Sequence, residues 1–163
     1  MINVLFVCLG NICRSPLAEG VFKALVAQQG LTEKINCDSA GTHGYHIGAL
    51  PDRRARRVAA DYGIQLTHTA RKLSSDDFAN FDYIVAMDES NLEHIQTQSY
   101  RSTGFYPEEG RIFTYRNFDH QADECGVPDP YYEDIAAFEN VYQIVTRCGE
   151  QFLEYLIKEH KLA

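Results

Sequence analysis

The chain has 163 residues, of which 45% are hydrophobic and 23% charged, the size and composition of one folded domain rather than of a disordered protein. A formal net charge of −8 disfavours nucleic acid as a partner, because a negative surface repels phosphates. The apolar run from Val4 to Leu9 is too short to cross a bilayer and follows no basic segment, so we expect neither a membrane span nor a secretory signal. Five cysteines, an odd number, are typical of free thiols in a reducing compartment. We therefore predict a cytoplasmic protein with a single domain over residues 1–163.

Strand and helix patterns alternate from the N-terminus onward. Residues 2–8 form a continuous β-branched and aromatic run, which is typical of a strand buried on both faces. Ser15 and Pro16 predict the N-cap and the first residue of a helix that stops at Gly30. The buried face of this helix is expected to carry Leu17, Val21 and Leu25.

The alternation continues to the C-terminus. We expect strands at 35–39, 81–86 and, more weakly, 111–115, with helices capped by Asp52, Asp88 and Asp134. The inward face of the helix after Asp52 would hold Ala55, Val58, Ala59 and Tyr62. The inward face of the helix after Asp134 would hold Phe138, Val141, Val145, Cys148, Phe152 and Leu156. This order predicts an α/β fold, a parallel sheet with helices on both faces. Ligands of such sheets bind at the carboxyl ends of the strands, which directs attention to residues 8–15.

The segment between the first strand and the first helix has the spacing Cys-x5-Arg, from Cys8 to Arg14. A loop at a helix N-terminus directs backbone N–H groups inward and so binds a tetrahedral oxyanion. Gly10 and Asn11 tolerate the left-handed conformations that such a loop needs. The Arg14 guanidinium can hold two phosphate oxygens at once.

The same positive field favours the thiolate form of Cys8 and makes its sulfur a nucleophile aimed at phosphorus. We expect the Ser15 hydroxyl to donate to this sulfur and also to cap the helix. A purely structural interpretation, in which Cys8 only ends a strand and Ser15 only starts a helix, leaves Gly10, Asn11 and Arg14 unexplained together.

The sequence from Val7 to Pro16, VCLGNICRSP, resembles the phosphate-binding motif of the low-molecular-weight protein tyrosine phosphatases. Further similar segments follow in order at 38–42, 68–71, 81–84, 87–92 and 129–132. The resemblance implies a three-layer α/β/α domain of flavodoxin-like type with four parallel strands. It also implies a phosphatase, with possible acid phosphatase activity, that forms a cysteinyl-phosphate on Cys8 and needs no metal or cofactor. The partner would be a tyrosine-phosphorylated protein, with phosphate and other oxyanions as inhibitors.

Asp129 is the candidate general acid. It lies in Val-Pro-Asp-Pro, where the two prolines stiffen the backbone on both sides. The residues alone favour a turn before the last helix, and it is the resemblance that assigns the acid and base role to Asp129. That role requires a proton for the leaving phenolate and then a carboxylate that accepts a proton from water.

The resemblance also assigns residues around the anion loop. Backbone amides from Leu9, Gly10, Asn11, Ile12, Cys13, Arg14 and Ser15 would bind phosphate. A substrate cleft would be lined by Leu9, Ile12, Tyr45, Tyr131 and Tyr132, although both tyrosines of the pair could instead be core aromatics. Loop support would come from Ser39, His68 and Asp88, with Asp88 also explained as a helix cap.

Cys13 is implied by the resemblance to be a redox partner that forms a reversible disulfide with Cys8. Cys37, Cys125 and Cys148 show no metal-ligand spacing, and a zinc site at Cys37, His43 and His46 lacks a fourth ligand. His43 and His46 around Tyr45 depart from some relatives and leave substrate preference open. The basic run of Arg53, Arg54, Arg56 and Arg57 is either a solvated helix face or a surface for an acidic phosphoprotein.

Three other functions compete with hydrolysis. An arsenate reductase on the same fold needs two more cysteines beyond the third strand, and residues 80–100 contain none. A non-catalytic phosphate-binding module would not need Cys8, Arg14 and Asp129 together. A flavodoxin-like cofactor site relies on hydroxyl and amide groups and gains nothing from a thiolate. We therefore favour the enzyme and expect a monomer or a weak homodimer.

Overall fold

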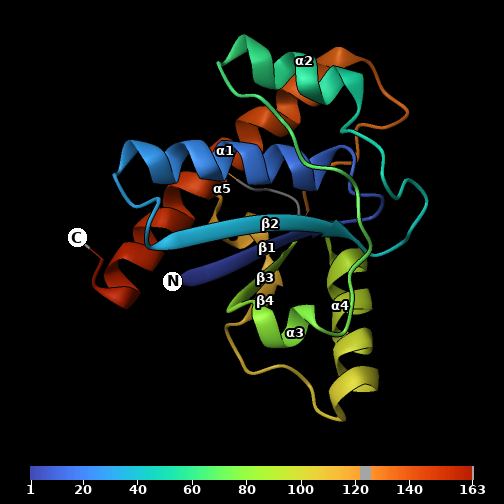
Figure 1. The fold of residues 1–163 in the computed structure, drawn as a ribbon. Coiled ribbons are helices and arrows are strands. Elements are labelled where there is room, and N and C mark those ends of the chain that lie inside the picture. The colour runs from blue at the N-terminus through green and yellow to red at the C-terminus, as the bar shows by residue number, and fades with distance from the viewer. Residues whose placement is uncertain (122–125, 163) are drawn as a thin grey trace.

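The computed structural model describes residues 1–121 and 126–162. Its four strands, β1 to β4, are all parallel and lie in the order β2-β1-β3-β4 (Figure 1). In chain order, the elements are β1 Ile2–Cys8, α1 Arg14–Gln28, β2 Ile35–Gly41, α2 Arg53–Asp61, α3 Asp77–Asn80, β3 Tyr83–Ala86, α4 Glu89–Thr103, β4 Ile112–Thr114, a 3-10 helix η1 Tyr115–Phe118, and α5 Ile135–His160.

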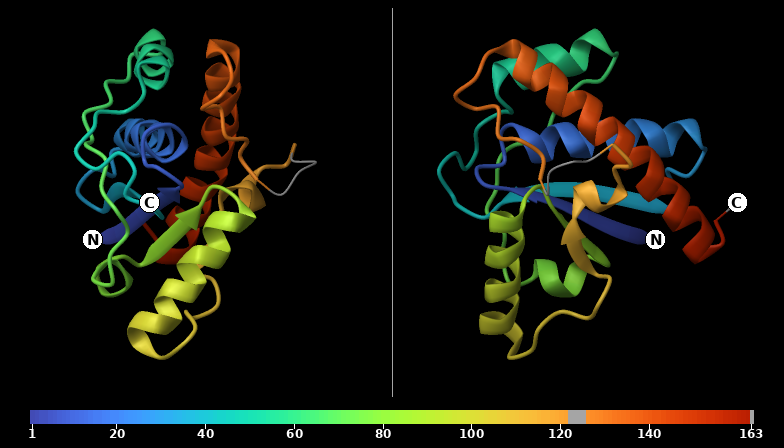
Figure 2. Two further views of the ribbon diagram at one scale, coloured as in Figure 1. Left: turned by 90° about the vertical axis from the view of Figure 1, so that its right-hand side faces the viewer. Right: turned by 180° about the vertical axis from the view of Figure 1, so that it is seen from behind.

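Helices cover both faces of the sheet, which confirms the predicted three-layer α/β/α arrangement. The two side views show α1, α2 and α5 on one face and α3 and α4 on the other (Figure 2). The protein has two hydrophobic cores, one on each face of the sheet, because alternate side chains of the central strand β1 point to opposite faces. Val4, Phe6 and Cys8 join the larger core with α1 and α5, whereas Leu5 and Val7 join the smaller core with Ile95 of α4.

The strand order places the candidate loop at the centre of one sheet edge. The chain leaves β1 for β2 on one side and later returns to β3 on the other, so β1 is the topological switch point. Cys8 pairs in register with Gly41 at the end of β2, and Val7 pairs with Ala86 at the end of β3. The segments that follow these three strands therefore meet beside Cys8.

Several predicted details differ from the structure. Helix α1 begins at Arg14, and its N-cap position is Cys13, so the predicted capping role of Ser15 is wrong. Ser15 lies within the first turn, and its hydroxyl contacts the Cys8 sulfur and the Asn11 amide instead of a backbone N–H of the helix. Tyr62 is 45% exposed rather than turned to the core, since its ring stacks on Tyr142 at the surface.

The strand and helix ends also shift. Strand β2 continues two residues beyond the prediction, because it pairs with β1 as far as Gly41. Helix α4 begins after the predicted Asp88 N-cap and ends at Thr103, and the next residue, Gly104, adopts a left-handed conformation. Helices α3 and η1 are short and were not predicted. Cys125 lies outside the described residues. Across those residues, no helix combines the length and the apolar character that crossing a membrane requires.

Candidate active site

The loop at residues 9–13 connects the end of β1 to the first turn of α1. Its carbonyl groups are held from outside: Cys8 O accepts from Thr42 N at 2.8 Å, Leu9 O from His43 N at 3.0 Å, and Ile12 O from Asp52 N at 2.7 Å. Because the Leu9 and Ile12 carbonyls face donors outside the loop, the loop N–H groups can point inward, where an anion at the helix N-terminus would accept from them.

Two residue types are required by the backbone of this loop and its neighbour. Asn11 has a φ of 59°, the left-handed region that asparagine tolerates better than most residues. Gly41 packs so closely that a Cβ there would lie 2.8 Å from the Leu9 carbonyl oxygen. A side chain at Gly41 would therefore displace the loop.

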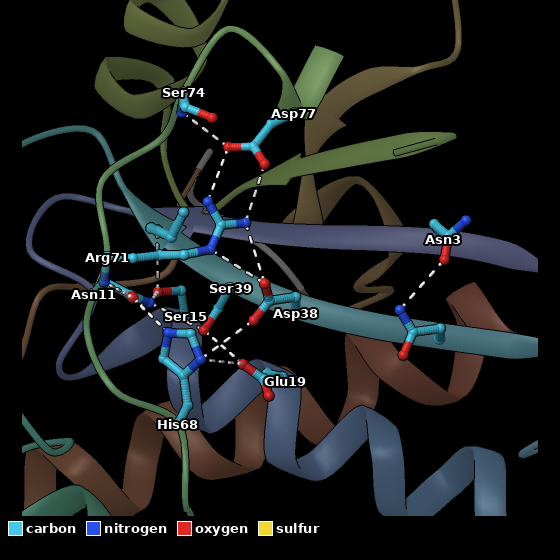
Figure 3. Close-up of polar contacts among 12 residues, drawn as sticks. Asn3, Asn11, Ser15, Glu19, Asp38, Ser39, His68, Arg71, Ser74 and Asp77 are labelled. Atoms are coloured by element: carbon cyan, nitrogen blue, oxygen red, sulfur yellow. Dashed lines mark hydrogen bonds and ion pairs between the residues drawn. The ribbon is translucent and has the colours of Figure 1, made fainter. Parts of the chain in front are cut away.

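The buried side chain of Asn11 holds the loop to three other segments (Figure 3). Its amide nitrogen donates to the hydroxyl oxygens of Ser15 at 2.8 Å and Ser39 at 3.0 Å. Its amide oxygen lies 2.7 Å from His68 Nε2 and accepts from Arg71 N at 3.0 Å. Every hydrogen-bonding group of this amide is thereby used, which fixes the loop conformation.

A charged cluster supports this network from behind (Figure 3). His68 Nδ1 lies 3.2 Å from Asp38 Oδ1 and 3.5 Å from Glu19 Oε1, and Ser39 donates to Glu19 at 2.6 Å. Although burial opposes ionisation of Asp38, hydrogen bonds from His68 and the Ser39 backbone and the nearby Arg71 lower its pKa to about 2. Glu19, Asp38 and His68 offer atoms within 4.8 Å of one another, but these atoms already bind each other, Ser39, Asn11 and Arg71.

Cys8 is buried at the bottom of the loop, and its sulfur lies 3.0 Å from the Ser15 hydroxyl oxygen. Arg14 lies at the start of α1 and is also buried. Burial opposes its charge, but Cys8 and the hydrogen bond to Asp88 outweigh this and raise the pKa of the guanidinium. Arg14 Nη1 donates to Asp88 Oδ2 at 2.6 Å and to the Val127 carbonyl at 3.1 Å. The orientation of Arg14 is therefore fixed before an anion binds.

Asp129 lies across the same cleft. Its Oδ2 is 3.7 Å from Arg14 Nη2, and its Oδ1 accepts from Tyr131 N at 3.1 Å. Arg54 of α2 holds this segment by donating to the carbonyls of Tyr131 at 2.9 Å and Glu133 at 2.6 Å. Asp52, the N-cap of α2, in turn accepts from Arg54 and donates its own N–H to the Ile12 carbonyl. Helix α2 therefore links the anion loop to the acid loop.

These segments enclose a cleft of about 320 Å³. The structure brings together all the predicted catalytic and cleft residues, and it adds His46, whose ring lies above Gly10 and beside Tyr131. The lining residues are Cys8, Leu9, Gly10, Ile12, Cys13, Arg14, Tyr45, His46, Asp129, Tyr131 and Tyr132. The predicted supports Ser39, His68 and Asp88 lie behind the loop and contact Asn11 or Arg14 rather than the cleft.

Burial and nearby charges act on Cys13, the second cysteine of this region. Burial, followed by the charges of Asp52, Cys8 and Asp129, raises the pKa of the Cys13 thiol well above its ordinary value. Cys13 is therefore a thiol at neutral pH. Cys37 and Cys148 are likewise buried, and burial raises the pKa of both thiols to about 12.

Sequence reasoning missed four supporting residues. Glu19 is a carboxylate on the buried face of α1, where the helical pattern predicts an apolar residue. Asp38 and Arg71 belong to segments that carried the family resemblance but had no role assigned to them. Arg54 was part of a basic run whose other members are exposed. The sequence signal for Arg54 was its position two residues after the Asp52 N-cap. An N-cap fixes where a helix begins and therefore which residues of its first turn face inward.

The low molecular weight phosphotyrosine protein phosphatase family profile matches residues 3–162. The human low molecular weight phosphotyrosine protein phosphatase is 45% identical over 152 residues, which cover 93% of this chain and 94% of that protein. A protein tyrosine phosphatase from Entamoeba histolytica, solved with Hepes in its active site, has a TM-score of 0.88 at 40% identity and covers 99% of both chains. An arginine phosphatase from Drosophila has a TM-score of 0.87 at 32% identity, covering 93% of this chain and 96% of that one. The chain therefore belongs to the low molecular weight phosphotyrosine protein phosphatase family.

Proposed function

We propose that the reaction proceeds through a phosphoryl group bound covalently to Cys8, with Asp129 as the proton donor and acceptor. The observation that carries this proposal is the placement of three groups on one cleft: the Cys8 sulfur at its bottom, Arg14 beside it, and Asp129 Oδ2 3.7 Å from Arg14 Nη2. A nucleophile, an anion clamp and an acid are the parts that phosphate-ester hydrolysis without a resident metal requires.

In the first step, the Cys8 thiolate attacks phosphorus and forms an S–P bond while the bond from phosphorus to the phenolic oxygen breaks. Asp129 gives its proton to that oxygen, so tyrosine leaves as a neutral phenol. In the second step, water attacks phosphorus, Asp129 takes a proton from this water, and the S–P bond breaks. Inorganic phosphate and the Cys8 thiolate result. Arg14 and the loop amides stabilise the phosphoryl oxygens in both steps.

The cleft walls favour an aryl phosphate as substrate. Leu9 and Ile12 supply aliphatic surface, and the Tyr45 and Tyr131 rings supply aromatic surface. An aromatic ring buries apolar area against such walls, whereas the charged guanidinium of phosphoarginine would lose hydration there. The arginine phosphatase among the similar structures makes phosphoarginine the second substrate to measure.

The test compares hydrolysis of matched peptides carrying phosphotyrosine, phosphoserine or phosphoarginine, with a chelator present. We expect phosphotyrosine alone to be cleaved efficiently. Cys8→Ser should lose all activity, and Asp129→Asn should lose about 10²- to 10⁴-fold in kcat, most strongly for esters with poor leaving groups. Rapid quenching of Asp129→Asn with a good leaving group should trap phosphate on Cys8.

Equal hydrolysis of phosphoarginine and phosphotyrosine would overturn the substrate assignment but not the mechanism. Residual activity of Cys8→Ser near that of the wild type would overturn the mechanism. The nucleophilic thiol also supports a reducing compartment, and we infer a cytoplasmic enzyme acting on tyrosine-phosphorylated proteins as a monomer or weak homodimer.

A further inference from the structure

A second cavity, of about 360 Å³, lies beside the catalytic cleft and is lined by basic and neutral polar side chains. Four basic residues contribute: His43 follows β2, Lys72 lies in the segment that bridges to Gly41, and His94 and Arg101 belong to α4. The other lining residues are Thr42, Thr97 and Gln98. Among the residues that the structure describes, no carboxylate lines this cavity, although the whole chain has a formal net charge of −8.

The α4 residues of the cavity recur at helical spacing. Thr97, Gln98 and Arg101 lie three, four and seven residues after His94, so all four side chains lie on one face of the helix. This face points to the strand ends of β2, because the His94 and His43 rings are 5.0 Å apart. The cavity is therefore built from three separate segments of the fold.

The positive charge of the cavity is not neutralised by the protein. Within residues 1–121 and 126–162, none of the four basic side chains forms a salt bridge. Burial and then the charges of His43, Lys72 and Arg101 lower the pKa of His94, so Lys72 and Arg101 supply the positive charge of the cavity and His94 offers a neutral ring that can donate a hydrogen bond. An oxyanion would supply the missing charge.

The cavity and the catalytic cleft share a wall. The His43 ring stacks on the Tyr45 ring, with centroids 5.2 Å apart and planes at 10°, and Tyr45 lines the catalytic cleft. The His43 N–H also donates to the carbonyl of Leu9 in the anion loop. The neighbouring rings of Tyr45, His43 and His94 lead from the catalytic cleft into the second cavity. Since an extended peptide advances about 3.3 Å per residue, the path along these rings corresponds to about two or three residues of a bound substrate.

We propose that His43, Lys72, His94 and Arg101 form a second anion-binding site, which holds a negatively charged side chain two or three residues from the phosphotyrosine. This inference rests on the proposed function, because the flanking charge is recognised on a substrate whose phosphotyrosine occupies the Cys8 cleft. The ligand chemistry is an oxyanion, which a glutamate carboxylate or a second phosphoryl group can supply. The site would make this enzyme prefer acidic or multiply phosphorylated segments.

The experiment measures kcat/KM for phosphotyrosine peptides that differ at one position, two or three residues to either side. That position carries alanine, glutamate or phosphoserine, which separates the carboxylate from the phosphoryl source. We expect the charged peptides to be preferred over the alanine peptide by about five- to tenfold at low ionic strength, mainly through a lower KM. The preference should shrink as salt is added.

The test variant is Lys72→Ala/Arg101→Ala, and the matched control is Lys34→Ala/Lys158→Ala. The control removes the same charge from exposed positions, and Lys34 lies before β2, at the amino ends of the strands. The test variant should lose the preference for charged peptides, and the control should retain it. Binding of the same peptides to Cys8→Ser protein, followed by fluorescence anisotropy, should give the same order of affinities.

The outcomes separate the second site from the reaction itself. Hydrolysis of the alanine peptide with no preference for charge, or a preference that survives Lys72→Ala/Arg101→Ala, would overturn the second site and leave the proposed function intact. If no phosphotyrosine peptide is hydrolysed, the proposed function fails, and the binding measurement with Cys8→Ser protein still decides whether the second site exists.

Discussion

Arg54 in helix α2 donates a hydrogen bond of 2.9 Å to the main-chain carbonyl of Tyr131, two residues after the candidate acid. The same guanidinium binds Asp52 and lies 4.4 Å from the centroid of the Phe138 ring. Because Asp52 N donates to the Ile12 carbonyl, one short helix fixes both the anion loop and the acid loop. The separation of the nucleophile from the acid therefore depends on a residue outside the cleft.

Arg54→Ala should loosen the acid loop and reduce kcat without abolishing phosphate binding. Since a small displacement of an acid weakens proton transfer, we expect about a tenfold loss with phenyl phosphate and a smaller loss with p-nitrophenyl phosphate, whose leaving group needs little protonation. Steady-state kinetics with both esters measures this difference. Arg53→Ala removes an exposed charge from the same helix and should leave both rates unchanged. An equal loss for the two esters would contradict a positioning role through Asp129.

Substitution of Asn11 separates its hydrogen bonds from its backbone conformation. Asn11→Ala removes the contacts to Ser15, Ser39 and His68 and also places an unfavourable side chain at a positive φ, so we expect a loss of about 2–4 kcal/mol in the free energy of unfolding. Asn11→Gly removes the same contacts but tolerates this φ, and should recover about 1 kcal/mol. Urea unfolding measures both values. Equal stability of the two variants would show that the backbone conformation carries no cost.

Asp38 should make stability depend on pH at the acid end. Its pKa is about 2 in the folded protein, below the ordinary value of 3.8, so its contribution is complete above about pH 4 and is lost as the pH falls toward 2. Because the side chain is partly exposed, we expect Asp38→Asn to cost only about 1 kcal/mol at pH 7. The difference from the wild type should narrow between pH 4 and pH 3 in urea unfolding. A constant difference across this range would contradict the assignment, and Asp61→Asn on the exposed surface serves as control.

Cys13 should protect the nucleophile from irreversible oxidation. Peroxide converts the Cys8 thiolate to a sulfenic acid, and the Cys13 thiol can displace water from it to form a disulfide that a dithiol then reduces. We expect the wild type to recover most of its activity with dithiothreitol after peroxide, and Cys13→Ser to recover little. Cys148→Ser, a substitution in α5, should behave like the wild type. Full recovery of Cys13→Ser would exclude Cys13 as the partner.

The local sequence was sufficient to predict the layers and the anion loop. The apolar run at 2–8 specifies a strand buried on both faces, and both of its faces are indeed packed by helices. Asp52 acts as the predicted N-cap of α2, accepting a hydrogen bond from Arg54 N. The Cys-x5-Arg spacing placed a thiol and a guanidinium in one loop at a helix N-terminus. These features depend on residues within one turn or one strand of each other, so their physical causes are present in the local pattern.

Only the tertiary structure decided which distant residues complete the site. His68 lies 57 residues from Asn11, Asp88 lies 74 residues from Arg14, and Arg54 lies 77 residues from Tyr131. These pairs meet because the strand order β2-β1-β3-β4 gathers the segments that follow the four parallel strands at one edge, and no local periodicity encodes that order. The basic cavity at His43 and Arg101 has the same origin, since His43 follows β2 and His94 belongs to α4. Burial of Glu19 likewise follows from the Ser39 and His68 groups that the folded chain places beside it.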